Sequence, residues 1–416
     1  MNGIDSIRYR SLSAIAAVGV SLTASLTLAA TPAVATPAPV ACPGLHVFGV
    51  QGTGQSSPAA DPTSDAGVLG ALLAPVMAAA PGLVTRSYIP YSAGFGGAVP
   101  GGGAAPYTVS VSEARHSLDT AVAQLHRDCP NTLIAGVGYS QGAQTMSWFA
   151  RDIGAGTGPV PADHIAGIAL YANPDRGPAA PVFPGRPGQT VPDPAPGTAG
   201  AAVGGVRFDA RLVSGSGIAE RDTGYGALEG RVADICVEGD LACSAPDRAA
   251  VLRVGAEIAA QADLHDPLAA VSSLGALLSA ALGDTWTTVL LHDFQLAPGR
   301  ADYIPELPLA QRLIDAADPR LPNPTPDEHA AAGVRWNEIM AAVVANPVAV
   351  LPALAGQLSA AWGQLVAENA DLLNPAVWAQ FVGTVAAHTD YAVTGRLASG
   401  TAWLTALAHD IAGAPS

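Results

Sequence analysis

Residues 131–149 read NTLIAGVGYSQGAQTMSWF, and this stretch decides the fold. Its first half predicts a buried strand over residues 132–136, and its second half predicts a helix. Between them lies a G-x-S-x-G sequence centred on Ser140, which in this strand–turn–helix context indicates a nucleophile elbow. Such a turn lifts the serine hydroxyl above a sheet and points the N–H of the next residue, Gln141, at a developing oxyanion. We therefore expect an α/β fold with Ser140 as its nucleophile.

The composition of the chain excludes some classes of partner. Its 416 residues carry a net charge of −15, and all 19 basic side chains are arginines. An acidic chain without basic clusters argues against binding to nucleic acid and against electrostatic binding to anionic membranes. The length is sufficient for one large domain or for two ordinary ones.

The N-terminus has the features of a secretory signal. Arg8 and Arg10 precede an apolar run over residues 12–30, and Ala-Val-Ala at residues 33–35 matches a cleavage site. We predict a signal peptide over residues 1–35 and export of the mature chain, with an uncleaved membrane anchor as the alternative. No other segment is predicted to cross a membrane.

The chain contains four cysteines, Cys42, Cys129, Cys236 and Cys243. In an exported protein they predict two disulfides, for which three pairings are possible. The natural pairing joins Cys236 to Cys243 in a short local loop and Cys42 to Cys129 across a long one. Neither C-x-x-C pairs nor neighbouring histidines accompany them, so we predict no metal site.

Hydrophobic patterns predict alternating strands and helices on both sides of the elbow. Continuous apolar strands of this kind indicate a parallel sheet with helices on both faces. Residues 173–205 are rich in proline and glycine and predict a long surface loop, and residues 208–213 predict a further strand. The other expected strands cover residues 45–50, 83–89, 164–171 and a short run beginning at residue 231, and the expected helices cover residues 65–80 and 110–128.

Several motifs follow one another along the chain. They are Cys42, Gly52-Thr53-Gly54, Cys129-Pro130-Asn131-Thr132, Gly138-Tyr139-Ser140-Gln141-Gly142 and Cys236-Val237-Glu238-Gly239-Asp240-Leu241-Ala242-Cys243. This order resembles the cutinase family of secreted serine esterases, in particular its actinobacterial members, over residues 42–243 and the C-terminal tail. The resemblance implies an α/β-hydrolase fold and an esterase that needs no metal or cofactor.

The resemblance also implies roles for single residues. Ser140 matches the nucleophile, and Asp240, inside the C-x-x-G-D-x-x-C motif, matches the acid that orients the base. The backbone N–H groups of Thr53 and Gln141 match the oxyanion donors. Asp234 competes with Asp240, but it lies at the end of a predicted strand, where a capping or ion-pairing role is more common.

The histidine base is harder to assign, because the family places it shortly after the aspartate. Here residues 244–387 intervene before His388, which stands in a predicted loop ahead of the last helix, residues 397–411. We predict His388 as the base because the family's catalytic histidine occupies such a loop. The other candidates after Asp240 are His265, His292, His329 and His409, of which His265 and His292 are the main alternatives.

The intervening residues have mostly helical patterns. Helices are expected at residues 246–262, 267–282, 327–344, 347–367 and 375–387, several of them beginning with proline after Asp, Asn or Ser. We predict a helical insertion over residues 244–380 that caps the active site, because it lies between two loops of the catalytic triad; a lateral position is the alternative. The remaining parts would be a signal peptide (1–35), a hydrolase core (36–243) and a C-terminal part of that core (381–416).

The sequence therefore predicts a secreted serine esterase that hydrolyses lipid or polymer esters. We expect a monomer that associates with lipid interfaces or with the cell envelope. The alternative is a non-catalytic cell-envelope protein that binds lipid or a partner on a hydrolase scaffold. That alternative predicts a displaced histidine or a blocked Ser140.

Overall fold

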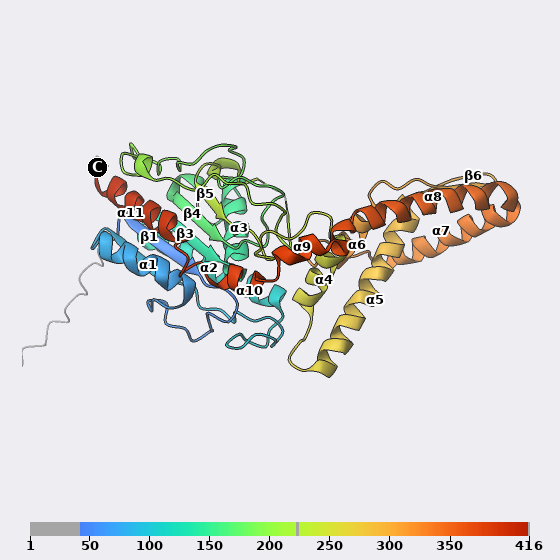
Figure 1. Cartoon of the computed structure of the whole chain (residues 1–416), viewed down its shortest axis with the longest axis horizontal. Helices are drawn as coiled ribbons and strands as arrows, with labels where there is room; N and C mark the ends of the chain where they lie inside the picture. Colours follow the sequence, from blue (N-terminus) through green and yellow to red (C-terminus); the bar gives the residue numbers. More distant parts are fainter. Residues whose placement is uncertain (1–41, 222–223, 415–416) are drawn as a thin grey trace, which may run out of the picture. The chain divides into compact units, whose positions relative to one another are not determined.

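The computed structural model describes residues 42–221 and 224–414, and a five-stranded parallel sheet is the core of their α/β part (Figure 1). The predicted signal peptide and its cleavage site lie outside these residues. The strand order is β2-β1-β3-β4-β5, and all four neighbouring pairs are parallel. The strands are β1 (Leu45–Val50), β2 (Val84–Tyr88), β3 (Leu133–Tyr139), β4 (Ile165–Tyr171) and β5 (Val232–Ile235). The predicted α/β architecture is thus confirmed.

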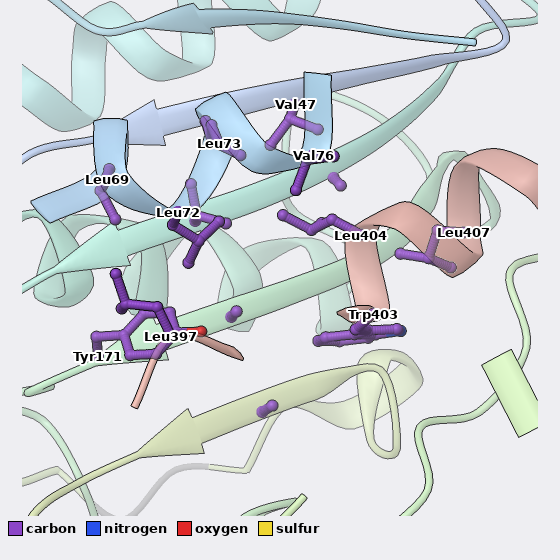
Figure 2. Packing of buried hydrophobic residues seen from close by; sticks show 14 of the residues in the cluster. Val47, Leu69, Leu72, Leu73, Val76, Tyr171, Leu397, Trp403, Leu404 and Leu407 are labelled. Carbon is purple, nitrogen blue, oxygen red and sulfur yellow. The ribbon is translucent and has the colours of Figure 1, made fainter. Parts of the chain in front are cut away.

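Two pairs of helices cover the two faces of the sheet. Helices α1 (Gly67–Ala79) and α11 (Ala398–Ala412) share one hydrophobic cluster with the strands, whereas α2 (Tyr107–Asp128) and α3 (Gln141–Gly154) share another. Figure 2 shows the first cluster, with leucines of α1 and of α11 and the indole of Trp403 close to the strands. Strands buried on both faces need apolar side chains throughout, which explains their unbroken hydrophobic runs.

The connection between β4 and β5 is mostly irregular, as its proline and glycine content predicts. Short 3-10 turns occur at η2 (Val203–Gly205) and η3 (Gly226–Leu228), as at η1 (Ala162–His164) before β4. The expected strand over residues 208–213 is wrong. Phe208 packs its ring against Phe183 and Trp403 instead of pairing in the sheet, and Leu212 is 65% exposed.

Residues 244–390 form the helices that the patterns indicate, with different bounds, and in addition α6, which is not among the expected helices. The helices are α4 (Ala250–Gln261), α5 (Pro267–His292), α6 (Leu309–Ala317), α7 (Pro326–Ala345), α8 (Pro347–Ala367), the 3-10 helix η4 (Ala370–Leu373), α9 (Pro375–Gln380) and α10 (Thr384–Thr389). Helix α5 is longer than expected, and the helix expected at residues 375–387 is divided into α9 and α10. A hairpin of β6 (Phe294–Ala297) and β7 (Arg300–Tyr303) was not predicted.

Local sequence signals explain where several of these helices begin. Asp266 caps α5 by accepting hydrogen bonds from two backbone N–H groups, and Asn374 caps α9 in the same way. Thr325 and Glu328 form a capping box at the start of α7. Each of these helices has proline in its first turn, where the missing N–H costs no hydrogen bond.

The two ends of this helical segment are hydrogen-bonded to each other. The Arg248 guanidinium donates to Asp371 at 2.8 Å, and the Asp371 N–H donates to the Arg248 carbonyl at 3.1 Å. One turn further in, the N–H of Ala250 donates to the carbonyl of Glu368. We call these two hydrogen-bonded stretches, residues 248–251 at the start of α4 and residues 368–371 at the start of η4, the neck.

Both predicted disulfides are present. Cys42–Cys129 joins the residues that precede β1 and β3, and Cys236–Cys243 closes the loop that follows β5. The first spans 87 residues of sequence and the second only 7. The disulfides therefore fix the start of two central strands and one short loop at the edge of the sheet where the strands end.

Candidate active site

Ser140 lies in a strained turn between β3 and α3. Its backbone has φ 54° and ψ −120°, in the left-handed half of conformational space that a residue with a Cβ rarely adopts. The turn is possible because Gly142 packs against the end of β1: a Cβ there would lie 1.9 Å from the Val50 carbonyl oxygen. Strand, sharp turn and helix together form the geometry of a nucleophile elbow.

Ser140, His388 and Asp240 form a continuous line of hydrogen bonds. The Ser140 Oγ is 2.9 Å from Nε2 of His388, and Nδ1 of His388 is 2.9 Å from Oδ1 of Asp240. A carboxylate only accepts, so Nδ1 carries the proton and Nε2 is the atom free to accept from the serine hydroxyl. This is the tautomer that a histidine base requires.

Asp240 is completely buried, and three donors hold its carboxylate. Besides His388, the N–H of Ala242 donates to Oδ1 at 3.0 Å and the Tyr391 hydroxyl donates to Oδ2 at 3.0 Å. Burial raises the pKa of Tyr391 well above its ordinary value, and the nearby Asp240 charge raises it further. Tyr391 therefore remains a protonated donor. A buried carboxylate with all these bonds satisfied keeps a single orientation toward the imidazole.

Contacts at both ends of the short helix α10 fix the position of His388. It lies in the last turn of α10, not in the loop that the sequence analysis predicts. The Tyr139 hydroxyl donates to the His388 carbonyl at 2.6 Å, and the two rings stack with centroids 5.4 Å apart. At the other end of α10, Thr384 accepts from the N–H of Leu241, next to Asp240. A short helix can thus replace the loop because these contacts fix its position.

The four other histidine candidates lie away from Ser140. His265 is bound between two neighbouring aspartates at 2.5 and 2.6 Å and is 54% exposed. His329 contacts a threonine and an aspartate of α5, whereas His292 and His409 are exposed on α5 and α11. Within residues 42–221 and 224–414, none of the four is hydrogen-bonded to Ser140.

Asp234, the competing carboxylate, has a different environment from Asp240. It lies on β5 and accepts a 2.8 Å hydrogen bond from Asn173. Burial raises its pKa to about 6, although the charge of Arg176 opposes this. It has no hydrogen bond to His388 in the described part of the chain. It therefore joins β5 to the segment that follows β4.

The two expected oxyanion donors flank the nucleophile. Gln141 begins α3, and its side chain is anchored to the Gly94 carbonyl at 3.0 Å. Gly52, just before Thr53, packs directly on the elbow: a Cβ there would lie 3.2 Å from the Cβ of Ser140. Among the described residues, the backbone N–H groups of Thr53 and Gln141 have no protein acceptor. Both are thus available to an oxyanion.

A cavity of about 790 Å³ opens beside the nucleophile. Ser140, His388 and Thr53 line it together with mostly apolar side chains, and residues of the helical segment complete its wall. The apolar lining includes Phe95, Val99, Val111, Trp148, Ile218, Leu241, Ala256, Ala260 and Val385. The volume and lining suit a small-molecule or acyl-chain site.

A buried group of charges joins the helical segment to the sheet domain at this cavity. Asp175, which is fully buried after β4, accepts from Gln144 at 2.8 Å and from Arg320 at 3.2 Å. Arg320 also donates to Glu257 of α4 at 2.9 Å. Burial raises the pKa of Glu257 to about 7, although the Arg320 charge opposes this. No local sequence motif marks these residues, so the sequence alone does not predict them.

The described residues contain no group of three His, Cys, Asp or Glu side chains that could hold a metal ion. The cavity beside Ser140 offers Glu257 as its one acidic group, already paired with Arg320.

Comparisons with known proteins agree with the motif order. The family model described as Cutinase matches residues 41–254. The chain is 31% identical to the carboxylesterase Culp6 homolog of Corynebacterium glutamicum over 151 residues, which are 34% of this chain and 44% of that protein. The matched part is thus less than half the length of that relative.

Two solved structures are similar to this chain at low sequence identity. An acetyl xylan esterase is 22% identical, with a TM-score of 0.34, and the match covers 56% of this chain and all of that one. A cutinase-like protein from Cryptococcus sp. is 17% identical, with a TM-score of 0.31, and covers 56% of this chain and 96% of its own.

Proposed function

Because the chain belongs to the cutinase family, we propose that it is an exported serine esterase that hydrolyses carboxylic esters. The main support is the hydrogen-bonded line from Ser140 through His388 to Asp240, with 2.9 Å at each step. Export is supported by the two disulfides, which form and persist in oxidising compartments. The non-catalytic alternative predicts a displaced histidine, which the 2.9 Å contact to Ser140 disfavours.

We propose the following roles for the triad. Nε2 of His388 takes the proton of the Ser140 hydroxyl while Oγ attacks the ester carbonyl carbon. The oxyanion that forms accepts from the backbone N–H groups of Thr53 and Gln141, each worth about 3–4 kcal/mol of transition-state stabilisation. His388 then protonates the leaving alcohol, and water hydrolyses the acyl-enzyme by the same steps in reverse order. Asp240 holds the imidazole and stabilises its charged form.

We also propose that residues 244–380 act as a partial cap. Helix α4 and the residues after α6 contribute Ala256, Ala260, Glu257 and Arg320 to the cavity beside Ser140. The contacts of α7 and α8 are with other elements of the helical segment, through the cluster around Ile339. Only the first part of the segment therefore borders the substrate, and it narrows the site toward a bounded acyl pocket.

The rest of the helical segment exposes an apolar surface that suits a lipid interface. Helix α8 contains no charged residue in 21 positions, and α5 is by length and composition apolar enough to cross a membrane, with only 17% of its most apolar window buried. The exposed side chains recur every three or four residues, so they share one side of each helix. They are Leu268, Val271, Leu278, Leu282 and Trp286 on α5, and Val348, Leu351, Leu358, Trp362 and Val366 on α8.

We propose that this surface rests on an uncharged lipid layer that presents the ester substrate. An apolar face of this extent on a soluble chain marks an interaction site. The acidic chain, with a net charge of −15, disfavours anionic headgroups. Because this binding depends on buried apolar area and not on charge, the affinity for the lipid layer should not fall as the salt concentration is raised.

Ester hydrolysis by the mature chain tests the function. We would measure turnover of p-nitrophenyl esters with short and long acyl chains, comparing the wild type with Ser140→Ala and His388→Ala. Both variants should lose at least about 10³-fold in kcat. His265→Ala and His292→Ala are the matched controls and should keep full rate. Retention of full rate by His388→Ala would show that the base is another residue, and no turnover by folded wild type would reject the esterase.

Vesicle flotation tests the interface. The wild type should bind vesicles of zwitterionic lipid at low and high salt, and Leu358→Ser with Trp362→Ser on α8 should abolish binding. Leu212→Ser is the control, because Leu212 is 65% exposed, at least as much as Leu358 (49%) and Trp362 (64%), but lies in the loop before β5. Absence of vesicle binding together with a concentration-dependent dimer in ultracentrifugation would instead assign this surface to a second copy of the chain.

A further inference from the structure

Two side chains in the wall of the cavity each leave one buried polar atom without a protein partner. They are the hydroxyl of Tyr107, at the start of α2, and Oε1 of Gln144, one turn after Ser140 on α3. Both residues line the same cavity as Ser140. Within residues 42–221 and 224–414, no protein group is hydrogen-bonded to either atom. Buried atoms of this kind are rare, because an unmade hydrogen bond costs stability.

The chemistry of their neighbours fixes which atom donates and which accepts. The Gln144 amide contacts the Asp175 carboxylate at 2.8 Å, and a carboxylate only accepts, so Nε2 faces Asp175 and the free atom is the acceptor Oε1. Burial raises the pKa of Tyr107 well above its ordinary value, so its hydroxyl keeps its proton and is a free donor. The wall thus offers one donor and one acceptor.

Both residues belong to the same part of the wall. Gln144 is bonded to Asp175, and Gln141, one turn earlier on α3, donates to the backbone carbonyl of Tyr107 at 3.4 Å. The remainder of the lining is mainly apolar, so this region is a polar island in an otherwise hydrophobic cavity. A ligand pocket commonly has this composition, with few polar groups that set orientation.

We propose that Tyr107 and Gln144 form a hydroxyl-binding subsite for the ester substrate. A hydroxyl group accepts from Tyr107 and donates to Gln144, so one group satisfies both atoms. A ketone would leave Gln144 without a donor. A carboxylate would do the same and would also face the buried acid Asp175. The inference rests on the proposed esterase function and adds that preferred substrates carry a hydroxyl near the ester.

The hydroxyl has two chemical sources, the acyl chain and the alcohol part, and two series of substrates distinguish them. In the first, p-nitrophenyl decanoate is compared with p-nitrophenyl decanoates that carry one hydroxyl, moved stepwise along the chain. In the second, the methyl ester of decanoic acid is compared with its 1-monoacylglycerol. We expect a preference in kcat/KM of about 5-fold or more for the hydroxylated member of one series, at a defined position.

Tyr107→Phe is the critical variant, because it removes the free donor and no protein hydrogen bond. The preference for the hydroxylated ester should fall toward one, because the substrate hydroxyl loses its donor. Tyr171→Phe is the matched control, since the Tyr171 hydroxyl is also buried and unpartnered among the described residues but does not line this cavity. It should keep the full preference.

The outcomes separate the subsite from the esterase function. Equal kcat/KM for both members of each series at every hydroxyl position would show that only water occupies the subsite, and would overturn the inference while leaving the esterase intact. An unchanged preference in Tyr107→Phe would overturn it as well. Thermal unfolding of Ser140→Ala gives an independent readout: a hydroxylated ester should raise its Tm more than the plain ester, and an equal rise would contradict the inference.

Discussion

The hydroxyl of Tyr139 donates a 2.6 Å hydrogen bond to the backbone carbonyl of His388, which lies 249 residues later in the chain. Tyr139 directly precedes Ser140, so the residue beside this serine also fixes the helix that carries the His388 imidazole. The ring of Tyr139 stacks on the His388 ring as well. The elbow therefore positions both residues of the Ser140–His388 hydrogen bond: Ser140 through the turn itself, and His388 through Tyr139.

Replacing Tyr139 with phenylalanine keeps the ring and removes this hydrogen bond. We expect kcat to fall about 3–10-fold with KM little changed, because the lost bond is worth about 1 kcal/mol and serves to align the imidazole. Steady-state kinetics and thermal unfolding would measure both effects. Tyr225→Phe is the control: its hydroxyl bonds to Ser147 outside the cavity, so it should lose comparable stability and keep kcat.

Exchanging the two buried aspartates for asparagine should affect catalysis to very different extents. Asp240→Asn favours the wrong imidazole tautomer, and kcat should fall by about 10³–10⁴-fold. Asp234→Asn should leave kcat within about 3-fold, because Asp234 bonds to Asn173 and not to His388. Kinetics on one chromogenic ester compares the two variants directly, and a larger loss in Asp234→Asn would exchange their assignments.

Glu257 predicts a pH dependence of stability. Its pKa is 4.5 for the hydrated side chain and about 7 in the folded protein, so between these values the folded chain holds a proton that the unfolded chain has lost. The free energy of unfolding should therefore fall as the pH rises from about 4.5 to about 7. Urea unfolding at a series of pH values would measure this slope.

Glu257→Gln provides the control for that slope, because glutamine keeps the shape and cannot ionise. The variant should have a flatter profile, above all between pH 6 and 7. Below about pH 6 a slope of the same sign should remain from Asp234, whose pKa burial raises to about 6. Identical profiles for variant and wild type would mean that Glu257 titrates normally in the folded chain.

Removing one disulfide should mainly reduce stability, and removing the other should mainly reduce activity. In the chain-entropy model the Cys42–Cys129 bridge, which spans 87 residues, contributes about 5 kcal/mol, and the Cys236–Cys243 bridge, which spans 7, contributes about 2 kcal/mol. Serine at both positions of the long bridge should lower Tm more. Serine at both positions of the short bridge should lower kcat more, because that loop carries Asp240. If the loss in kcat relative to the loss in Tm were the same for both variants, this prediction would be contradicted.

The sequence was most informative where local patterns sufficed. The five strands, the four helices on the sheet and both disulfides are confirmed, because apolar runs, glycine turns and cysteine spacing act over short distances. The hairpin at residues 294–303 is not predicted because each strand has only four residues and β7 carries an arginine and an aspartate. The expected strand at 208–213 is wrong because Phe208 is buried whereas Leu212 is 65% exposed, so its apolar residues do not share one buried sheet face.

The candidate site was predictable to a different degree at each residue. Ser140 and Asp240 lie in local motifs, whereas His388 had to be chosen among five histidines, since its place depends on how residues 244–387 return to the sheet. The structure brings His388 to Ser140, and its role as base stays a prediction. Glu257, Arg320 and Tyr107 carried no signal, because their positions in the cavity arise only from tertiary packing.

The neck gives the helical segment a modular character. Its entering and leaving stretches are hydrogen-bonded between Arg248 and Asp371, so a short linker between residues 247 and 372 should reconnect the chain without moving either end. Such a deletion would shorten the sequence separation of Asp240 and His388, which is 148 residues in the full chain. The segment could thus be removed, or exchanged for another of equal end-to-end span, and the chain would serve as a scaffold for interchangeable lids.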